Sequence, residues 1–266
     1  SAEGEVTEVV TPHNSFAGTL TVTEDGRLAV GPDGCRDVHI ILQKDGANGA
    51  QLGDKVGALL TSRGNRHADH RAAVTQRFGS AEFASECAKA ILYGRDVRQD
   101  FPPEVLQEAA AYDNAAIDPT EAAHRMDLLG LPIFTIDSAE TKDIDDAISL
   151  MKLQEGGYEL GVHIADVSHY VRPGSAMDEE AFERATSIYY ADKVIPMLPT
   201  QLSNGICSLN EGTDRLAFSC LMRLDEAGNI HSYQFVKTVI RSRVKGVYKE
   251  INALLDGTAA EEVRRK

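Results

Sequence analysis

The segment from Thr135 to Ala147 (TIDSAETKDIDDA) constrains the fold of this chain more than any other. Apolar residues flank it (PIF before, AISL after), and within ten residues it holds four aspartates: Asp137, Asp143, Asp145 and Asp146. Carboxylates held this close together repel one another and are costly to bury, so a fold that tolerates them usually places a cation there. Hard divalent ions such as Mg²⁺ or Mn²⁺ prefer oxygen ligands. The segment therefore predicts an acidic loop after an apolar strand, and it favours phosphoryl chemistry.

A plain acidic turn explains the same residues. Aspartate suits solvated turns because its side chain bonds its own backbone, and on the residue pattern alone this interpretation is as good as a metal site. A calcium loop fits poorly, because the D-x-[DN]-x-[DN]-G pattern and its distal glutamate are missing. The rest of the chain has to decide between the turn and the metal site.

The composition is that of a soluble protein with one large domain or two ordinary ones. The chain has 266 residues, 42% of them hydrophobic, and no apolar run approaches membrane-spanning length. The N-terminus SAEGEVTEVV lacks the basic region and apolar stretch of a secretory signal. We therefore expect no membrane association, and we expect a monomer.

The four cysteines are widely scattered and form no CxxC pair: Cys35, Cys87, Cys207 and Cys220. This spacing argues against a zinc site and against a disulfide scaffold. It suits the reducing cytoplasm, with thiols that are mostly buried.

The net charge of −14 is unusual for a protein that binds nucleic acid, because contact with phosphates normally uses an excess of Lys and Arg. The charge argues against a protein that coats RNA broadly. It is compatible with an enzyme that holds a few phosphates at a metal site, since the metal offsets part of the negative charge locally.

Residues 5 to 78 alternate between short apolar runs and turn residues. The predicted strands are residues 16–22, 27–31, 37–42, 55–62 and 70–78, separated by EDG, GPDG, DGANG and LGD segments. Five short strands predict a closed β-barrel of the OB or cold-shock type over residues 1–79. Such barrels often bind single strands through aromatic side chains, but only Phe16 and Phe78 are aromatic here. A structural or guiding barrel and an RNA-binding barrel are equally open.

A helical connector is predicted over residues 80–119. Residues 80–94 have a Ser start and a Gly stop, and residues 101–112 begin with prolines and continue at helical spacing. Asp118-Pro119 marks the end of the connector.

The remaining residues, 120–266, mix strands and helices, which makes the whole chain α+β. Predicted strands are 132–137, 147–153, 158–165, 215–225 and 230–244, with helices over 176–190 and from 247. QEGG joins the second and third strands as a hairpin, and DEAGN joins the last two.

These motifs resemble the catalytic domain of the ribonuclease II/ribonuclease R (RNB) family. The aspartate spacing, HIADVSHYV, PMLP and LSNGICSLN agree in order over Leu128 to Tyr248. The N-terminal barrel resembles the cold-shock domain that precedes this catalytic domain in ribonuclease R-like members. The expected fold is therefore a five-stranded barrel, a helical connector and the N-terminal part of a mixed α/β RNB domain.

The resemblance implies a metal-dependent hydrolytic 3′-to-5′ exoribonuclease that degrades single-stranded RNA to nucleoside 5′-monophosphates. It implies that Asp137, Asp143 and Asp146 hold one or two Mg²⁺ (or Mn²⁺) ions and that Asp145, also at the metal, is indispensable to cleavage. It implies that Tyr189 stacks on the 3′-terminal base, which tolerates any sequence because every base has a π-face. From the residues alone, Tyr189 at the end of a helix is more often a core side chain.

Functional roles are conceivable for other polar residues, but structural roles explain them at least as well. For His163, Asp166 and His169 a structural or supporting role is favoured, because strand alternation separates positions 163 and 166 and imidazole suits Mg²⁺ poorly. Turn and cap roles explain three further residues as well as RNA contacts do: Asn204, Ser208 and Asn210. A basic run either borders an RNA channel or is a solvated strand end: Arg241, Arg243 and Lys245.

The resemblance also implies that the catalytic domain continues well past Lys266. The expected remainder carries an arginine and a glutamate near the scissile phosphate, a second aromatic clamp and usually an S1 domain, so we expect a fragment or a naturally short protein. Two other functions stay open: a catalytically inactive RNA-binding or scaffold protein, and an unrelated phosphodiesterase of small molecules. The complete aspartate set favours the exoribonuclease.

Overall fold

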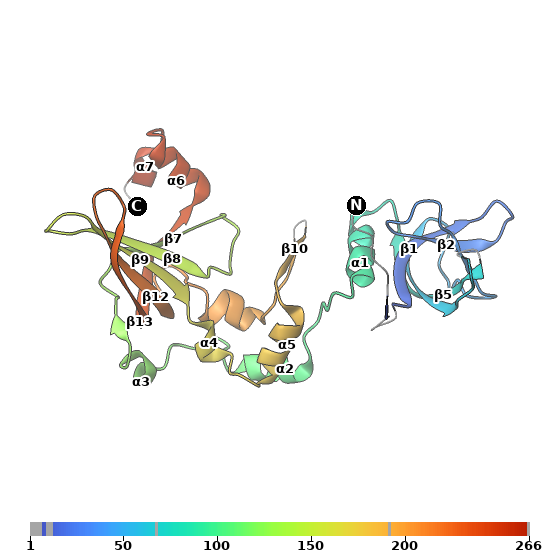
Figure 1. Cartoon of the computed structure of the whole chain (residues 1–266), viewed down its shortest axis with the longest axis horizontal. Helices are drawn as coiled ribbons and strands as arrows, with labels where there is room; N and C mark the ends of the chain where they lie inside the picture. Colours follow the sequence, from blue (N-terminus) through green and yellow to red (C-terminus); the bar gives the residue numbers. More distant parts are fainter. Residues whose placement is uncertain (1–6, 9–12, 67–68, 191–192, 265–266) are drawn as a thin grey trace. The chain divides into compact units, whose positions relative to one another are not determined.

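The computed structural model describes residues 7–8, 13–66, 69–190 and 193–264. The chain divides into two compact units, Ser1–Arg98 and Gln99–Lys266 (Figure 1). No helix within the described residues is long and apolar enough to cross a membrane.

The first unit is a closed five-stranded barrel, as the sequence predicts. Its strands are β1 (Ser15–Val22), β2 (Leu28–Pro32), β3 (Ile40–Leu42), β4 (Asp54–Ser62) and β5 (Arg71–Ser80), in the order β1-β2-β3-β5-β4. Antiparallel pairing of β1 with β4 closes the barrel. Apolar side chains that alternate along the strands fill the interior: Leu20, Val30, Ile40, Leu42, Val56, Ala58, Ala72 and Val74.

Two predicted boundaries in this unit are wrong. Strand β3 begins at Ile40 rather than Asp37, because Asp37 adopts a positive φ of 61° that belongs to a turn. Helix α1 (Ala84–Gly94) begins after the predicted Ser80, because Ser80 ends β5 and its Oγ accepts a hydrogen bond from the Glu82 backbone N–H.

Helix α1 packs on the barrel. The Tyr93 ring contacts Phe78 edge-on with centroids 5.6 Å apart, and its hydroxyl lies 2.9 Å from Thr75 Oγ1. Gly57 permits this approach, since a Cβ there would lie 2.6 Å from the Tyr93 ring. α1 thus shares a compact unit with the barrel, whereas α2 (Pro103–Ala110) lies in the second unit. The division at residues 79 and 119 stays a prediction.

The second unit is built on a six-stranded mixed sheet in the order β12-β9-β8-β7-β13-β6 (Figure 1). The strands are β6 (Met126–Asp127), β7 (Ile133–Asp137), β8 (Asp146–Lys152), β9 (Tyr158–Ala165), β12 (Asp214–Leu224) and β13 (Ile230–Val247). β13 is long enough to pair with β12 along its first part and with β7 along its last, which curls the sheet. The predicted β8–β9 and β12–β13 hairpins are both present.

One face of the sheet packs on short helices. These are α2, α3 (Pro119–Ala122), α4 (Val167–Tyr170), α5 (Ala176–Arg184) and the irregular helix η2 (Gln201–Ile206). α6 (Tyr248–Leu255) and α7 (Glu261–Arg264) follow β13. The core joins strand residues such as Ile133, Ala147 and Leu216 to helix residues such as Val105 and Leu202.

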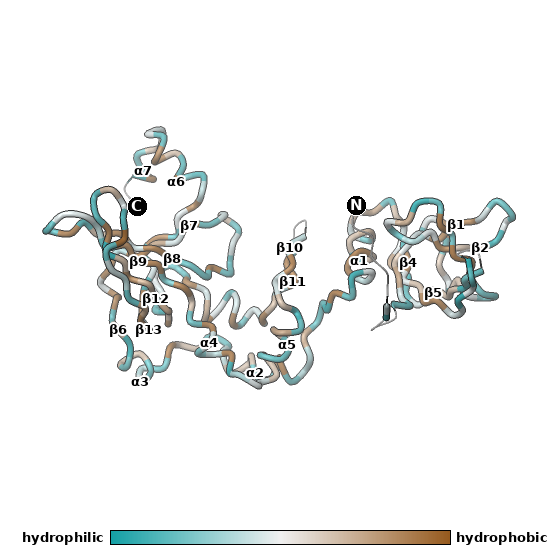
Figure 2. The backbone as a smooth tube through the Cα atoms, viewed as in Figure 1, coloured by the Kyte–Doolittle hydropathy of each residue, from teal (hydrophilic) through white to brown (hydrophobic). Residues whose placement is uncertain are grey.

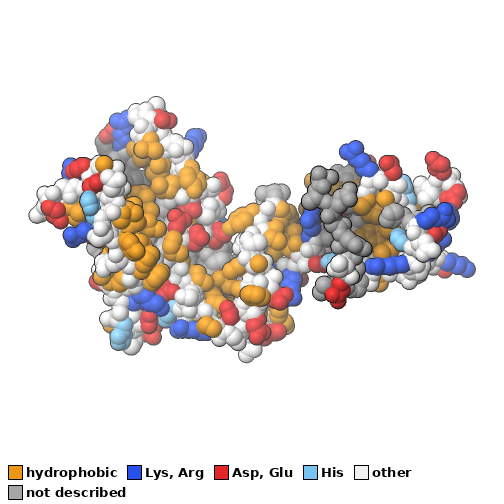
Figure 3. All heavy atoms as spheres, in the orientation of Figure 1, with side chains coloured by type: hydrophobic (Ala, Val, Ile, Leu, Met, Phe, Trp, Pro, Cys, Tyr) orange, Lys and Arg blue, Asp and Glu red, His pale blue; other side chains and the backbone are white. Residues whose placement is uncertain are grey.

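The other face of the sheet carries apolar side chains that remain exposed: Leu150, Ile164, Phe218, Tyr233 and Phe235. Cross-strand register places Ile164 beside Phe218, and the Phe218 and Phe235 rings stack with centroids 5.9 Å apart. Figure 2 shows the hydrophobic stretches along β8 and β9, and Figure 3 shows hydrophobic side chains gathered on this unit.

The predicted helix over 176–190 is too long. α5 begins at the predicted residue, where Ser175 Oγ accepts from the Asp178 N–H at 3.2 Å, but it ends at Arg184 because Ala185 adopts a left-handed φ of 60°. The chain then forms β10 (Ile188–Tyr190), which pairs with β11 (Lys193–Ile195). Tyr189 therefore lies on a strand and not at a helix end.

Candidate active site

The four aspartates lie in the acidic loop, which we define as residues 137–146. Asp137 is the last residue of β7 and Asp146 the first of β8, and the two strands pair only further back, at Ile133 and Phe134. Asp137 still pairs with β13 and Asp146 with β9, and residues 138–145 between them belong to no strand. This confirms the predicted position of the loop, directly after the strand that begins near Pro132.

The loop is fixed in its second half by Ile144, whose side chain is 2% exposed in the core. The Ile144 N–H donates to Ser208 Oγ at 3.1 Å, and the Ile144 carbonyl accepts from the Leu209 N–H at 2.8 Å. Next along the chain, the Asp145 carbonyl accepts from the Ala165 N–H at 2.9 Å. These bonds give the aspartates on either side of Ile144 a defined backbone.

The aspartates perturb one another electrostatically. Burial raises the pKa of Asp137, and the negative charges of Asp146, Asp145 and Asp143 raise it further, while the Lys245 cation opposes them. Partial desolvation also raises the pKa of Asp145, with the charges of Asp146 and Asp143 acting in the same direction. The loop thus concentrates negative charge that the protein itself only partly neutralises.

The donor set fits a hard divalent ion. Asp137 Oδ2 is buried and accepts no hydrogen bond from any residue that the structure describes, which leaves a carboxylate oxygen available to a cation. Within the described ranges, no three His, Cys, Asp or Glu side chains already stand in the arrangement that would hold a metal ion. The fit therefore rests on the all-oxygen chemistry of the four carboxylates and on the unpartnered Asp137 oxygen.

Tyr189 lies beside the acidic loop. Its hydroxyl donates a hydrogen bond to Asp143 Oδ2, which raises the Tyr189 pKa to about 12, while 65% of the residue stays exposed. Both residues line a pocket of about 370 Å³ together with Asp145, and its apolar wall includes Val167, Met197 and Leu198. The structure thus brings Tyr189 together with two of the four aspartates.

His163 is a core residue, as the favoured interpretation had it. It is fully buried between Ser149 and Ser219, whose Oγ atoms lie 3.0 Å from Nε2 and 2.8 Å from Nδ1. Burial lowers the His163 pKa to about 4, so the imidazole is neutral at physiological pH. Gly161 makes room for the ring, since a Cβ there would lie 2.7 Å from Nε2.

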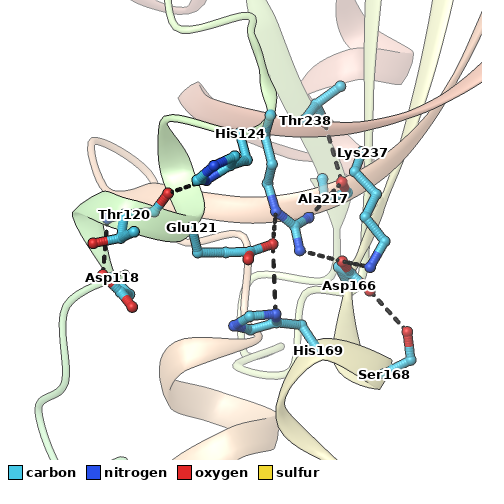
Figure 4. A network of polar contacts seen from close by, with 11 residues as sticks. Asp118, Thr120, Glu121, His124, Asp166, Ser168, His169, Ala217, Lys237 and Thr238 are labelled. Carbon is cyan, nitrogen blue, oxygen red and sulfur yellow. Dashed lines mark hydrogen bonds and ion pairs between the residues drawn. The ribbon is translucent and has the colours of Figure 1, made fainter.

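Asp166 and His169 belong to a polar network around Arg125 (Figure 4). The Arg125 guanidinium lies 2.7 Å from Asp166 and 2.8 Å from Glu121, and its side chain is 1% exposed. Burial alone would raise the Asp166 pKa, but the hydrogen bonds from Arg125 and Ser168 hold that pKa below its ordinary value. The network ties α3 to the turn that follows β9.

His169 contacts this network through Glu121, whose Oε1 lies 3.7 Å from Nδ1. Burial lowers the His169 pKa, and the hydrogen bond from Arg125 lowers the Glu121 pKa. Arg125 and Glu121 were not predicted as members of a polar site. No sequence signal marks them, because Arg125 and Asp166 are far apart in the chain and meet only through the sheet.

Arg241 and Arg243 are exposed on β13, which agrees with the predicted solvated strand end, and the role beside an RNA channel stays a prediction. Arg241 Nε donates to Asp214 at 2.6 Å, and an Arg243 N–H donates to the Leu129 carbonyl at 3.1 Å. Lys245 Nζ donates to carbonyls of the acidic loop at Ala139 (3.0 Å) and Thr141 (2.6 Å). Lys245 therefore contacts the acidic loop, which its position in a basic run of the sequence did not indicate.

Polar residues of the LSNGICSLN segment also form hydrogen bonds within the protein. Ser208 is 1% exposed and bonds the acidic loop, and the Asn210 side chain donates to the Asn204 carbonyl at 3.2 Å. Part of the segment is helical in η2 rather than a loop.

The four thiols are free, but only Cys207 is buried and Cys35 is exposed, so the prediction of mostly buried thiols is wrong.

Comparisons with known proteins agree with this architecture. A model of the RNB domain matches residues 125–266, more than half of the chain. Ribonuclease R of Thermotoga maritima is 43% identical over 79% of this chain and 30% of its own length, and Ribonuclease R of Vibrio parahaemolyticus is 35% identical over 99% and 31%. The chain thus spans about a third of the length of these curated relatives.

Solved structures show the same fold. RNase R of Mycoplasma genitalium, in complex with ribose methylated single-stranded RNA, superposes with a TM-score of 0.81 at 28% identity over 94% of this chain and 40% of its own. Yeast Ssd1, described as a pseudonuclease, has a TM-score of 0.76 at 16% identity over 96% and 33%, and shows the fold alone. Together with the family model and the curated relatives, these structures show that the chain belongs to the RNB domain family.

Proposed function

We propose that the protein is a metal-dependent hydrolytic exoribonuclease that degrades single-stranded RNA from its 3′ end to nucleoside 5′-monophosphates. The observation that carries this proposal is the acidic loop, which holds four intact aspartates, one with a buried unpartnered oxygen, next to an exposed tyrosine ring. Relatives named Ribonuclease R support the reaction class. The free thiols support a reducing cytoplasm as its location.

Four carboxylates would hold one or two Mg²⁺ or Mn²⁺ ions: Asp137, Asp143, Asp145 and Asp146. When bound, the metal supplies a water of lowered pKa for in-line attack and stabilises the leaving oxygen. Asp137 offers its unpartnered oxygen from the end of β7, and Asp146 offers its carboxylate from the start of β8. Asp145 lies on the pocket wall with Tyr189, so its carboxylate would orient the reacting groups at the phosphodiester bond.

Tyr189 would set which bond is cleaved. Its hydroxyl is bound to Asp143, so the position of the ring is tied to the carboxylates, and its exposed face is free to stack on a base. A 3′-terminal base on that ring would place the adjoining phosphodiester bond near the acidic loop. This arrangement recognises the end of a strand without reading its sequence.

The alternative is a catalytically inactive RNA-binding or scaffold protein. The fold alone allows this alternative, since Ssd1 shares it and is described as a pseudonuclease. Four mutually repelling aspartates count against it, because a protein without a catalytic cation gains nothing by keeping them together. A small-molecule phosphodiesterase has in its favour only the scarcity of basic residues in a chain of net charge −14.

One experiment separates these functions. The protein is incubated with 3′-tailed single-stranded RNA and Mg²⁺, alongside Asp145→Asn and the control Asp256→Asn, which removes the same charge from the exposed end of α6. We expect stepwise release of nucleoside 5′-monophosphates that only Asp145→Asn abolishes. Binding of RNA without cleavage by the unsubstituted protein would support the inactive alternative, and no interaction with RNA would favour the small-molecule enzyme.

A further inference from the structure

Two side chains outside the aspartate set bond the backbone of the acidic loop, one in each half of the loop. Ser208, two residues after the end of η2, bonds the second half of the loop, and Lys245, near the end of β13, bonds the first half. We propose that Ser208 and Lys245 are positioning residues that fix the acidic loop in the conformation in which its aspartates bind metal. The proposal rests on the proposed function for its catalytic consequence.

Ser208 satisfies two backbone groups of the loop at once. Its Oγ donates to the Lys142 carbonyl at 2.7 Å and accepts from the Ile144 N–H at 3.1 Å. These two groups bracket Asp143, so the hydroxyl fixes the peptide units on both sides of that aspartate. Ser208 is itself held in place, because Arg215 Nε donates to its carbonyl at 2.7 Å.

Lys245 acts on the other half of the loop. Its Nζ donates to the carbonyls of Ala139 and Thr141, in the turn directly after Asp137. Parallel pairing of β13 with β7 sets Lys245 opposite Thr135. The Lys245 backbone N–H donates to Glu211 Oε2 at 3.1 Å. The lysine stem therefore starts from rigid backbone on two sides and reaches across to the loop.

The hydrogen-bond donors of Ser208 and Lys245 are directed at the acidic loop, which argues against a role of either side chain as a direct contact to RNA. The Ser208 hydroxyl has one proton, which the Lys142 carbonyl accepts, and the residue is 1% exposed. Two of the three Lys245 N–H donors are directed at loop carbonyls. Removal of either side chain leaves loop backbone groups without these partners, and a loop outside the sheet ladder has few others to replace them.

The test uses Ser208→Ala and Lys245→Met with matched controls. Ser242→Ala removes a buried hydroxyl from β13 that donates to the Val244 carbonyl at 3.2 Å, and Arg243→Met removes a cation from β13 whose carbonyl partners are at Leu129 and Gly130. Lys245→Arg keeps the cation. The readouts are hydrogen exchange of the loop amides without metal, Mn²⁺ affinity of the protein without RNA, and kcat and KM on single-stranded RNA.

We expect Ser208→Ala and Lys245→Met to speed exchange at residues 139–145, to weaken Mn²⁺ binding and to lower kcat, each by about ten-fold, which corresponds to the loss of one buried hydrogen bond. KM for RNA stays within about two-fold, Lys245→Arg restores most of the loss, and both controls behave like the unsubstituted protein. Loss of kcat with unchanged loop exchange would overturn the proposal. A rise in KM alone, or equal losses in the controls, would also overturn it.

The exchange measurement separates this proposal from the proposed function. If the unsubstituted protein cleaves no RNA, faster loop exchange in the two variants but not in the controls still supports the positioning role. Unchanged loop exchange refutes that role, whatever the protein does to RNA.

Discussion

Tyr189 combines a bound hydroxyl with an exposed ring. The hydroxyl donates to Asp143, and the neighbouring Tyr190 on β10 makes no such bond among the described residues. Stacking and tethering are separable by substitution, because phenylalanine keeps the ring and loses only the hydroxyl. The residue therefore offers a direct test of the proposed placement of an RNA 3′ end on its ring.

We expect Tyr189→Ala to weaken binding of the RNA 3′ end about ten-fold or more, because stacking of a base on an aromatic ring contributes about 1–3 kcal/mol. Tyr189→Phe keeps the stacking and loses one hydrogen bond, so its loss is smaller. The measurement is KM on single-stranded RNA together with the length of the shortest fragment left. Tyr190→Ala is the matched control, and an equal effect of that variant would contradict the assignment of Tyr189.

His163 makes the stability of the second unit depend on pH. Its pKa is lowered from 6.5 to about 4 by burial, so between these values the unfolded chain binds a proton that the folded one does not. The free energy of unfolding is therefore unaffected by His163 above pH 6.5, and this one group lowers it by about 3 kcal/mol as the pH drops to about 4. Urea unfolding from pH 7.5 to 4.5 measures this loss. We expect the free energy of unfolding to depend less steeply on pH in His163→Gln. The same pH dependence in that variant would show that groups other than His163 cause the loss.

At the scale of elements, α5 ends at a residue that is poorly suited to its backbone. Ala185 has a φ of 60°, where a Cβ is strained and glycine is not. We expect Ala185→Gly to raise the free energy of unfolding by about 1 kcal/mol. Ala181→Gly, inside the same helix, is the matched control and lowers it by about as much. Chemical unfolding measures both, and destabilisation by Ala185→Gly would contradict this account.

The same residue shows what the sequence leaves open. The apolar spacing of AMDEEAFERATSIYY predicts a helix throughout, and nothing in it signals a left-handed alanine, so Tyr189 is misplaced onto the helix. By contrast, strand alternation and turn residues predict the barrel strands and both hairpins, because these signals are local. The proposed roles of Ser208 and Lys245 could not be predicted from the sequence, since each bonds a loop more than sixty residues away in the chain.

At the scale of the whole molecule, the residues that the structure describes form two hydrophobic cores that share no residue. One lies inside the barrel and includes Val56, and the other joins the mixed sheet to its helices and includes Leu216. The boundary between the compact units, at Arg98, separates them. A unit with its own core is stabilised by its own contacts, so unfolding of one need not require unfolding of the other.

Two core substitutions test this independence by calorimetry. Val56→Ala and Leu216→Ala each remove buried methyl groups, and we expect each to cost about 2–3 kcal/mol in its own unit. The thermogram of the protein should contain two transitions, with Val56→Ala lowering the melting temperature of one and Leu216→Ala that of the other. Because Leu216 pairs with the strand that carries Lys245, only Leu216→Ala is expected to speed hydrogen exchange in the acidic loop. A single transition shifted by both substitutions would mean that the two cores unfold as one.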